Sequence, residues 1–493
     1  MKNTPEVKLA IVAVSRDCFP IEVSKRRLAA LMAECSKLKL NAFACATVIE
    51  TETDTLKALD EAKRGGANAA VVYLGNFGPE APLSIFAEKF DGPVLVCGAA
   101  EESGEDLVAG RGDALCGMLN AAYNFALRGV RVHTPEQPVG LPAELASRIA
   151  RFVPVAKVVC GLKGLKVFTF GPRPQDFFAC NAPIKALYDL GVEVMENSEL
   201  DLLQMFQETA GSKREIDAVA ADMARELGPG NKYPDLLPKQ ACLELTLLKF
   251  LEQNLGSKQH GVFANKCWPA FEKALEFAPC YVNSRLAGHG IPVACEVDIY
   301  GAVSEYLAQL SSDHAATLLD INNSVPADLL PKNADLAGAT AADLFMGFHC
   351  GNTPKSCMKS FSMNYQIIMH RVMEDPTKEP NISRGTLEGT LRPGDLTIFR
   401  LQGLAGGGLS SYIGEGRILD LDPRSFGGIG IIAIPGFLRF YRHVLIGRQF
   451  PHHTAVSFAH SGAVLFDALK LLGVGEIIVP LPAGTRYPRE NPF

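Results

Sequence analysis

The chain has 493 residues, a length at which a single hydrophobic core no longer grows and two or three domains are expected. Hydrophobic residues make up 47% and charged residues 21%, ordinary globular values that exclude disordered and fibrous classes. The net charge of −6 offers no basic surface for nucleic acid or an acidic membrane. No apolar run approaches the ~20 residues of a bilayer span. The 13 cysteines are scattered without a C-x-x-C pair, and no secretion signal is evident, so we expect a cytoplasmic protein.

The first third of the chain alternates apolar strands with amphipathic helices. Strands are predicted at Leu9–Val14, Ala42–Val48, Ala69–Leu74 and Val94–Val96, and helices at Val23–Cys35 and Thr55–Arg64. Runs that are apolar on both faces and separated by helices indicate a parallel sheet covered on both sides. The segment Val130–Leu141, with two prolines, is interpreted as the exit from this unit. We therefore expect a first α/β domain over residues 1–160.

A second α/β pattern begins near Lys166. Its strands are predicted at Lys166–Phe170, Val192–Met195, Gly261–Ala264, Pro292–Cys295 and Ala316–Leu319. This pattern predicts a second α/β domain over residues 161–350, which would carry the acids described below.

After Asn352 the pattern changes to alternating runs separated by Gly, Pro and Asp turns. Strands are predicted at Gln366–His370, Gly385–Leu391, Asp395–Leu401, Tyr412–Leu421, Ile429–Ile434 and Ala455–Phe458, and helices at Phe437–Ile446 and Gly462–Leu472. Such runs are typical of antiparallel or barrel-like structure. The predicted fold is therefore α/β, with two Rossmann-like doubly wound domains followed by a β-rich, barrel-like domain over residues 351–493.

Acidic residues end two neighbouring strands of the second predicted domain. Glu296 follows one strand, with Asp298 two residues later, and Asp320 follows the next, with Asn322 two residues later. Ligands of open α/β sheets bind beyond the carboxyl ends of strands, and strand–helix–strand spacing would place Glu296 and Asp320 side by side at one sheet edge. Each acid alone is as often a helix cap or turn residue. Two close carboxylates repel unless a cation or a shared proton lies between them, which favours a functional site.

Two adjacent histidines, His452 and His453, precede an apolar strand of the last domain. Neighbouring side chains on an extended backbone point to opposite faces, so we expect at most one of them at a given site. A lone histidine is more often a hydrogen-bonded core or surface residue than a ligand. Combined with the two acids, however, one imidazole makes an oxygen-rich set that suits Mn²⁺ or Mg²⁺.

Three further residues are weaker candidates. Arg16 follows the first strand and could hold a hydroxyl-rich or anionic ligand, although a local salt bridge is an equal alternative. Trp268, the single tryptophan, could offer a flat face to a sugar, although packing is its commoner role. His349 lies in a small, polar segment that could equally be an interdomain linker. No strand-linked G-x-G-x-x-G or Walker loop occurs, so no nucleotide cofactor is expected.

Three motifs in this order, Ala294-Cys-Glu-Val-Asp298, Leu319-Asp-Ile-Asn-Asn323 and His452-His-Thr454, make the chain resemble the L-fucose isomerase/L-arabinose isomerase family. The resemblance covers most of the chain and is strongest from about Lys166 onward. It implies a metal-dependent aldose–ketose isomerase of carbohydrate metabolism whose Mn²⁺, with Mg²⁺ or Co²⁺ as alternatives, is held by Glu296, Asp320 and His453. It also implies a homo-hexamer or trimer-based assembly in which the first domain of a neighbouring subunit helps to close each pocket.

The residues predicted to contact the sugar extend this set beyond the three ligands. Substrate-binding roles are predicted for Arg16, Trp268, Asn322, His349 and His452. The His-His pair is similar to that of L-arabinose isomerases, whereas Asp320 as the second acid departs from their pair of glutamates. These mixed features leave the sugar open between a pentose and a deoxyhexose.

The expected reaction moves a carbonyl between C1 and C2 of an open-chain sugar through a cis-enediol or enediolate. A divalent cation on O1 and O2 would stabilise this intermediate, and Glu296 and Asp320 would exchange the proton. A hydride shift would use the same ion. Two alternatives are an epimerase using the same site and a non-catalytic, two-lobed sugar-binding or regulatory protein, which would not explain the third domain or the acid pair.

Overall fold

The computed structural model describes residues 3–488 and 490–491 of the chain. The chain divides into two compact units. The N-terminal unit comprises residues 5–161 together with Asp467–Gly473, and the C-terminal unit comprises most of the remainder. No helix among the described residues combines the length and the apolar composition needed to cross a membrane.

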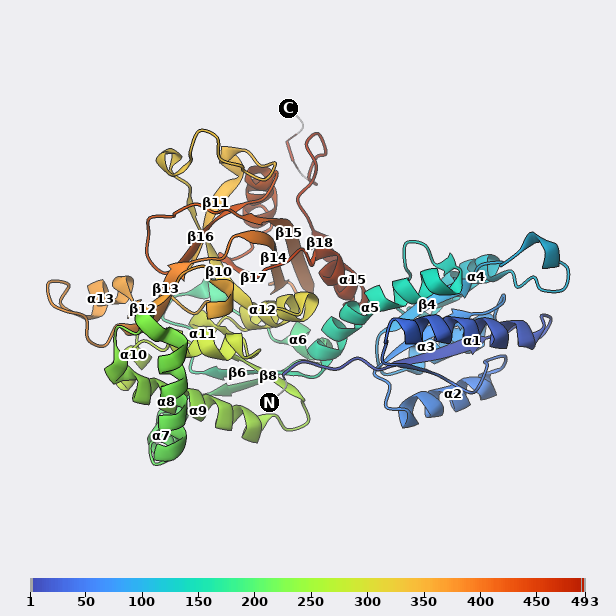
Figure 1. Cartoon of the computed structure of the whole chain (residues 1–493), viewed down its shortest axis with the longest axis horizontal. Helices are drawn as coiled ribbons and strands as arrows, with labels where there is room; N and C mark the ends of the chain where they lie inside the picture. Colours follow the sequence, from blue (N-terminus) through green and yellow to red (C-terminus); the bar gives the residue numbers. More distant parts are fainter. Residues whose placement is uncertain (1–2, 489, 492–493) are drawn as a thin grey trace. The chain divides into compact units, whose positions relative to one another are not determined.

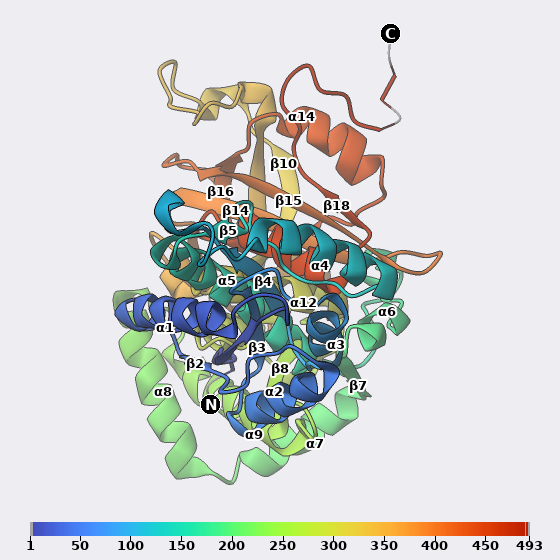
Figure 2. The same ribbon diagram turned by 90° about the vertical axis from the view of Figure 1, so that its right-hand side faces the viewer.

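The N-terminal unit contains a parallel sheet of five strands in the order β2-β1-β3-β4-β5. Figure 2 labels β2, β3, β4 and β5 of this sheet. The strands are β1 (Leu9–Val14), β2 (Ala42–Ala44), β3 (Ala69–Leu74), β4 (Val94–Ala99) and β5 (Val139–Gly140). The helices are α1 (Ile21–Lys37), α2 (Glu52–Arg64), α3 (Glu80–Lys89), α4 (Ala114–Arg128) and most of α5 (Pro142–Lys163). Every residue of β1, β3 and β4 is buried, which confirms the predicted parallel sheet with both faces covered.

One interpretation of this unit was wrong. The segment Val130–Leu141 contributes the short strand β5, which pairs with β4, and therefore belongs to the sheet. Two residues of strand are too short for periodicity to reveal them.

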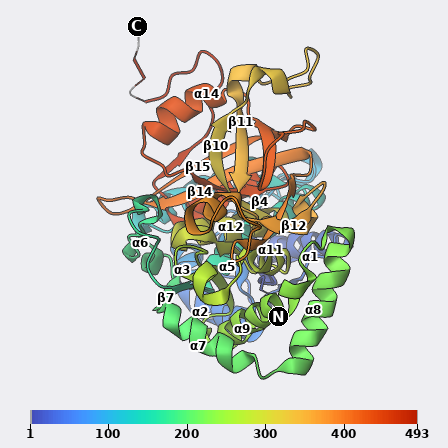
Figure 3. The same ribbon diagram turned by 90° about the vertical axis from the view of Figure 1, so that its left-hand side faces the viewer.

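The C-terminal unit contains a second parallel sheet, with the strand order β7-β6-β8-β9. Its strands are β6 (Leu165–Phe170), β7 (Glu193–Asn197), β8 (His260–Ala264) and β9 (Val293–Ala294). Its helices are α6 (Lys185–Asp189), α7 (Glu199–Thr209), α8 (Lys213–Leu227), α9 (Leu237–Asn254), α10 (Phe271–Leu275), α11 (Cys280–Gly288) and α12 (Ile299–Ser312). Helices α7 and α8 pack against α9, as Figure 3 shows.

A large mixed sheet completes the C-terminal unit. Its strands are β10 (Ala316–Ser324), β11 (Leu344–His349), β12 (Ser362–Tyr365), β13 (Arg384–Thr390), β14 (Gly394–Gly403), β15 (Leu409–Ile418), β16 (Gly428–Ala433), β17 (His453–Ser457) and β18 (Glu476–Ile478). The associated helices are α13 (Ile367–Met373) and α14 (Phe437–Phe440), whereas α15 (Gly462–Leu472) begins in this unit and continues into the N-terminal unit at Asp467. The order β16-β11-β10-β17-β14-β15, with β15 pairing again to β16, closes these strands into a ring. Helix α12 packs between this ring and the parallel sheet (Figure 1).

Two strand predictions for this unit were wrong. Ala316–Leu319 was predicted to join the second α/β domain, but it begins β10, which is antiparallel to β11 and β17 in the mixed sheet. Gln366–His370 was predicted as a strand, but α13 begins at Ile367. A short apolar run is compatible with both the helical and the strand period, so its secondary structure and its sheet are determined by contacts with residues distant in sequence. The three predicted domain ranges remain a prediction.

Candidate active site

Glu296 is placed by a tight turn at the end of β9. The 3₁₀ turn Cys295–Val297 contains two consecutive left-handed residues, Glu296 with φ 53° and Val297 with φ 57°. The amide of Val297 donates to the carbonyl of Asn265 at 2.9 Å, which ties this turn to the end of β8. A non-glycine residue in this conformation costs ~1–3 kcal/mol and persists where the surroundings impose it, most often at functional sites.

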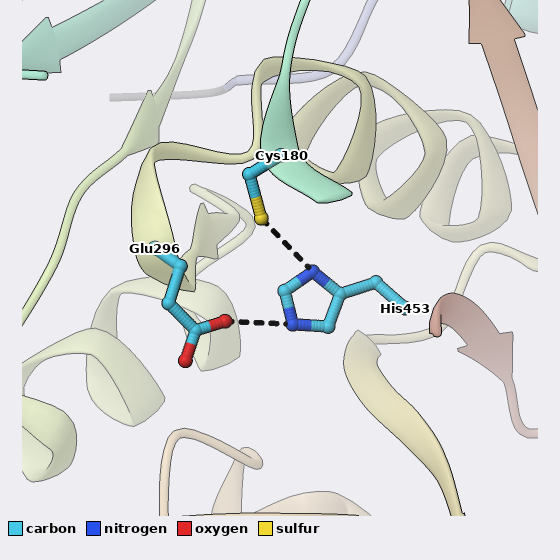
Figure 4. A group of neighbouring side chains, drawn as sticks. All are labelled: Cys180, Glu296 and His453. Carbon is cyan, nitrogen blue, oxygen red and sulfur yellow. Dashed lines mark hydrogen bonds and ion pairs between the residues drawn. The ribbon is translucent and has the colours of Figure 1, made fainter. Parts of the chain in front are cut away.

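Asp320 and His453 meet through strand register. They are directly opposite each other in the antiparallel pair β10–β17, where facing residues project from the same side. Nε2 of His453 lies 2.9 Å from Oε2 of Glu296, a contact drawn in Figure 4, and it lies 3.4 Å from Oδ1 of Asp320. The structure thus brings the three residues predicted as ligands together. The prediction that Glu296 and Asp320 end neighbouring strands of one sheet was wrong, because β9 and β10 belong to different sheets.

The three facing atoms of this cluster share an unusual property. Oε2 of Glu296, Oδ1 of Asp320 and Nε2 of His453 are buried and have no hydrogen-bond partner among the described residues. Buried polar atoms are normally paired, and unpaired ones call for an explanation such as an ion. Two carboxylate oxygens and one imidazole nitrogen are a donor set that suits Mn²⁺ or Mg²⁺. The donor types present therefore suit a divalent cation, and the ligand atoms of Asp320 and His453, with those of His452, lie within 4.8 Å of one another.

The other ring nitrogen of His453 lies in a buried polar network. Nδ1 is 2.8 Å from Oδ2 of Asp298 and 3.9 Å from Sγ of Cys180 (Figure 4 shows Cys180). Arg400 donates to both oxygens of Asp298, at 2.5 and 3.0 Å, and also to Oε1 of Gln402. The side chains of His453, Asp298 and Arg400 are only 1–2% exposed. His453 is thus held from behind by a carboxylate–guanidinium pair.

The electrostatics of the cluster favour a cation at its centre. Burial alone would raise the pKa of Glu296, but its contact with His453 and the charge of neighbouring imidazoles lower that pKa. Burial opposes protonation of His453, yet its contacts with Asp298, Cys180 and Glu296 raise its pKa well above the usual value. Burial and the charge of His453 lower the pKa of His452 to about 4, which leaves His452 neutral at pH 7. Because a ligand histidine must be deprotonated, an ion at the centre would replace the proton of His453.

The expectation that only one of the adjacent histidines reaches the site was wrong. Nε2 of His452 lies 3.6 Å from Oδ1 of Asp320, and the rings of His452 and His453 are 4.1 Å apart. The strand β17 begins at His453, so His452 precedes the extended segment in which side chains alternate. Asp320, His452 and His453 form one of the groups whose ligand atoms lie within 4.8 Å of one another.

His349 and Trp268 border the same cluster. The His349 ring lies 5.8 Å from that of His453, and a ligand nitrogen of His349 lies within 4.8 Å of the carboxylate of Glu296. Trp268 packs edge-on against Phe177 at 6.4 Å, and Phe177 packs edge-on against His452 at 5.4 Å. The aromatic side chains thus extend one side of the site.

Asn322 and Arg16 have no contact with this cluster among those that the structure describes within their own units. Asn322 is exposed at a bulge of β10 and lines a cavity of about 220 Å³ with Phe437 and Tyr441. Arg16 belongs to the N-terminal unit, where its guanidinium lies 3.6 Å from Glu80 and over the ring of Phe77. Their predicted substrate contacts remain predictions.

Three contributors to the site were not predicted from the sequence as site residues. Arg400 is a lone charge inside the apolar run Leu396–Leu401, a pattern that signals a buried acidic partner. Asp298 carries no local signal beyond following Glu296 by two residues. Cys180 is one of several scattered cysteines, and nothing in the sequence distinguishes it.

Comparison with known proteins identifies the class of the chain. Residues 10–163 match the model of the fucose/sulfoquinovose isomerase N-terminal domain, and residues 347–478 match that of the L-fucose isomerase C-terminal domain. Sulfoquinovose isomerases from Priestia aryabhattai and Priestia megaterium are each 26% identical over 341 residues, covering 65% of this chain and 70% of theirs. A sulfoquinovose isomerase from Clostridium sp. (strain MSTE9) is 25% identical over 324 residues, covering 64% of this chain and 66% of its own.

These matches define a sugar isomerase that interconverts an aldose and a ketose. The chain belongs to the fucose isomerase-like family. The resemblance predicted from its three short motifs is thereby confirmed.

Proposed function

We propose that this protein is a divalent-metal-dependent aldose–ketose isomerase in which Glu296, Asp320 and His453 hold the ion. The supporting observation is that Oε2 of Glu296 and Oδ1 of Asp320 lie 2.9 and 3.4 Å from Nε2 of His453, and that these buried atoms have no hydrogen-bond partner among the described residues. Manganese is the proposed ion, with magnesium or cobalt as alternatives, because hard oxygen donors outnumber the single imidazole. When bound, such an ion supplies a Lewis acid for the oxygens of the sugar.

The two carboxylates supply the proton transfer. Isomerisation requires removal of a proton from the carbon beside the carbonyl and return of a proton to the neighbouring carbon. Glu296 and Asp320 approach the same nitrogen of His453 from different elements, Glu296 from the turn after β9 and Asp320 from β10. One carboxylate takes the proton and the other returns it, and each can contribute ~10²–10⁴-fold to the rate. Neutral His452 and the nearby His349 would donate or accept hydrogen bonds with the sugar hydroxyls.

The proposed substrate is an open-chain pentose or deoxyhexose. The names of the relatives favour sulfoquinovose, a sugar with a sulfonate group, among the deoxyhexoses. We propose that Arg173 binds the sulfonate. Its guanidinium lies over the ring of Phe178, and its buried Nε has no hydrogen-bond partner among the described residues, so this N–H could donate to an anion. Arg173 lies on the same loop as Phe177 and Cys180, which contact His452 and His453 respectively.

A sugar panel in D₂O tests this function. The purified protein with Mn²⁺ is incubated with sulfoquinovose, L-fucose and L-arabinose, and products are followed by NMR. We expect one aldose to yield its ketose with deuterium at C1 or C2, and we expect chelation to abolish turnover until Mn²⁺ is restored.

Each contrary outcome of the panel has a distinct meaning. Ketose without deuterium would replace proton transfer by a hydride shift, and inversion at one carbon would indicate an epimerase. Binding of a sugar without conversion, unchanged by chelation, would contradict the enzyme and favour a binding protein.

We also propose that the chain forms a homo-oligomer through α4. Four large apolar residues on α4, spaced by four positions, are 66–71% exposed: Leu115, Leu119, Tyr123 and Leu127. The opposite side of α4 is already buried, so this helix is apolar on two sides. A continuous exposed apolar stripe of this kind is typical of a protein–protein contact.

The Leu119→Glu variant is expected to shift the protein to a smaller assembly, because it places a charge in the centre of the stripe. Sedimentation or light scattering would measure the mass. Leu56→Glu on α2 is the matched control, because Leu56 is also exposed, at 60%, but has no such stripe, and it should assemble like the wild type. A monomeric wild type, or a Leu119→Glu variant of wild-type mass, would contradict this interface.

A further inference from the structure

Both ring nitrogens of His453 have acidic neighbours, but the two sides differ. On the Nε2 side the carboxylates of Glu296 and Asp320 approach without making a hydrogen bond. On the Nδ1 side Asp298 lies at hydrogen-bond distance, 2.8 Å. A neutral imidazole carries one proton, and the nitrogen that donates it leaves a lone pair on the other. The partner of Nδ1 therefore decides what Nε2 presents to the cluster.

Asp298 itself has no freedom to turn. Its Oδ2 faces His453 Nδ1 and accepts from Nη1 of Arg400, and its Oδ1 accepts from Nη2 of Arg400 and from the amide of Gly301 at 2.8 Å. A carboxylate offers about four acceptor sites, and all four are used here. Arg400 is fixed in turn by Gln402, whose Oε1 accepts from Nε and Nη2 at 3.0 and 2.7 Å. Of the two neutral tautomers of His453, only the one with its proton on Nδ1 satisfies this arrangement.

The two oxygens of Asp298 make different contacts, one with the backbone of α12 and one with His453. Oδ1 caps the first turn of α12 through Gly301, a purely structural contact. Oδ2 makes the contact with His453, which a helix cap does not require. Capping of α12 therefore does not account for the contact between Asp298 and the imidazole of His453.

We propose that Asp298, clamped by Arg400, is a positioning residue that fixes His453 with a proton on Nδ1 and a free Nε2 lone pair directed at the cation site between Glu296 and Asp320. This inference rests on the proposed function, because it assigns the purpose of the network to metal binding. Loss of a carboxylate behind a ligand histidine typically weakens metal affinity by about 10–100-fold.

Two substitutions separate positioning from capping. In Asp298→Asn one oxygen becomes an NH₂ group, so either the cap is lost or an N–H faces Nδ1 and moves the imidazole proton to Nε2. In Asp298→Ser the hydroxyl retains a cap but is too short to reach His453. Because either change leaves Arg400 buried without its anion, the double variant Asp298→Asn/Arg400→Met replaces any single variant that fails to fold.

The measurement is Mn²⁺ affinity of the full chain by titration with EPR detection of free Mn²⁺, without sugar. We expect Asp298→Ser to raise the Kd by about 10–100-fold, and Asp298→Asn to do the same when its N–H faces Nδ1. The matched control is Asp343→Asn, because the carboxylate of Asp343 also accepts backbone amides, from Thr340 and Leu438, and is 8% exposed. This control should keep the wild-type Kd even where its thermal stability falls.

Wild-type Mn²⁺ affinity in Asp298→Ser, with weakened binding in Glu296→Gln, would overturn the positioning role and leave the proposed function intact. Equal affinity in Glu296→Gln and the wild type, or no binding by the wild type, would instead remove the proposed metal site. If Asp343→Asn raised the Kd for Mn²⁺ by the same factor, the effect of the Asp298 variants would be explained by a general loss of stability, and the positioning role would be overturned.

Discussion

The Glu296→Gln variant is expected to remain folded and to lose aldose–ketose interconversion by about 10²–10⁴-fold. Glutamine has nearly the same shape, and Oε2 of Glu296 makes no hydrogen bond that folding would miss. The substitution removes both a negative charge beside His453 and a group that can take a proton. Turnover should therefore fall more than the KM for the sugar rises.

The control for this variant is another buried carboxyl of the same unit. Glu305 on α12 is 1% exposed, and burial raises its pKa to about 8, so it is largely protonated at pH 7. Glu305→Gln therefore replaces one neutral group by another and should keep near wild-type turnover. The measurement is kcat and KM for the substrate found in the sugar panel, with Mn²⁺ in excess. Turnover by Glu296→Gln within a factor of ten of the wild type would remove Glu296 from the chemistry.

The Arg400→Met variant is expected to lose about 3–5 kcal/mol of unfolding free energy. Arg400 and Asp298 are 1% and 2% exposed, so truncating the guanidinium leaves a buried carboxylate with His453 as its remaining charged partner. Stranding one partner of a buried pair costs far more than the pair itself contributes.

Urea unfolding measures this loss conveniently. Trp268 is the single tryptophan and belongs to the C-terminal unit, so its fluorescence reports on the unit that contains Arg400. Arg417→Met in the same sheet is the matched control, because the pair of Arg417 with Asp395 is 50% and 54% exposed and should contribute about 0–1 kcal/mol. If both variants unfold at the same urea concentration as the wild type, the buried pair has no special role in stability.

Much of the fold could be predicted because local pattern determines strand existence. The strands β1 and β3 were predicted at Leu9–Val14 and Ala69–Leu74, the bounds that the structure has, since a strand buried on both faces is a continuous apolar run. Strand partners could not be predicted in the same way. The run beginning at Ala316 was recognised as a strand, but its pairing with β17 joins residues far apart in sequence.

The residues of the site also differ in how far the local sequence could identify them. Glu296, Asp320 and His453 could be selected because each ends or begins an apolar strand and their motifs resemble one family. The supporting pair could not, because Arg400 and Asp298 are 102 residues apart and belong to different elements. The prediction that His452 and His453 point to opposite faces assumed that both lie in the strand. It was wrong because β17 begins at His453 and does not include His452.

The register of β10 against β17 has a consequence for how this chain can change in length. An insertion or deletion of one residue within either strand would transfer every following side chain to the opposite face, so apolar side chains would leave the core and Asp320 would no longer face His453. The exposed segment 404–408 between β14 and β15 lies outside this alignment. We therefore expect that hairpin to tolerate changes in its length, whereas a change of spacing within β10 or β17 should separate Asp320 from His453.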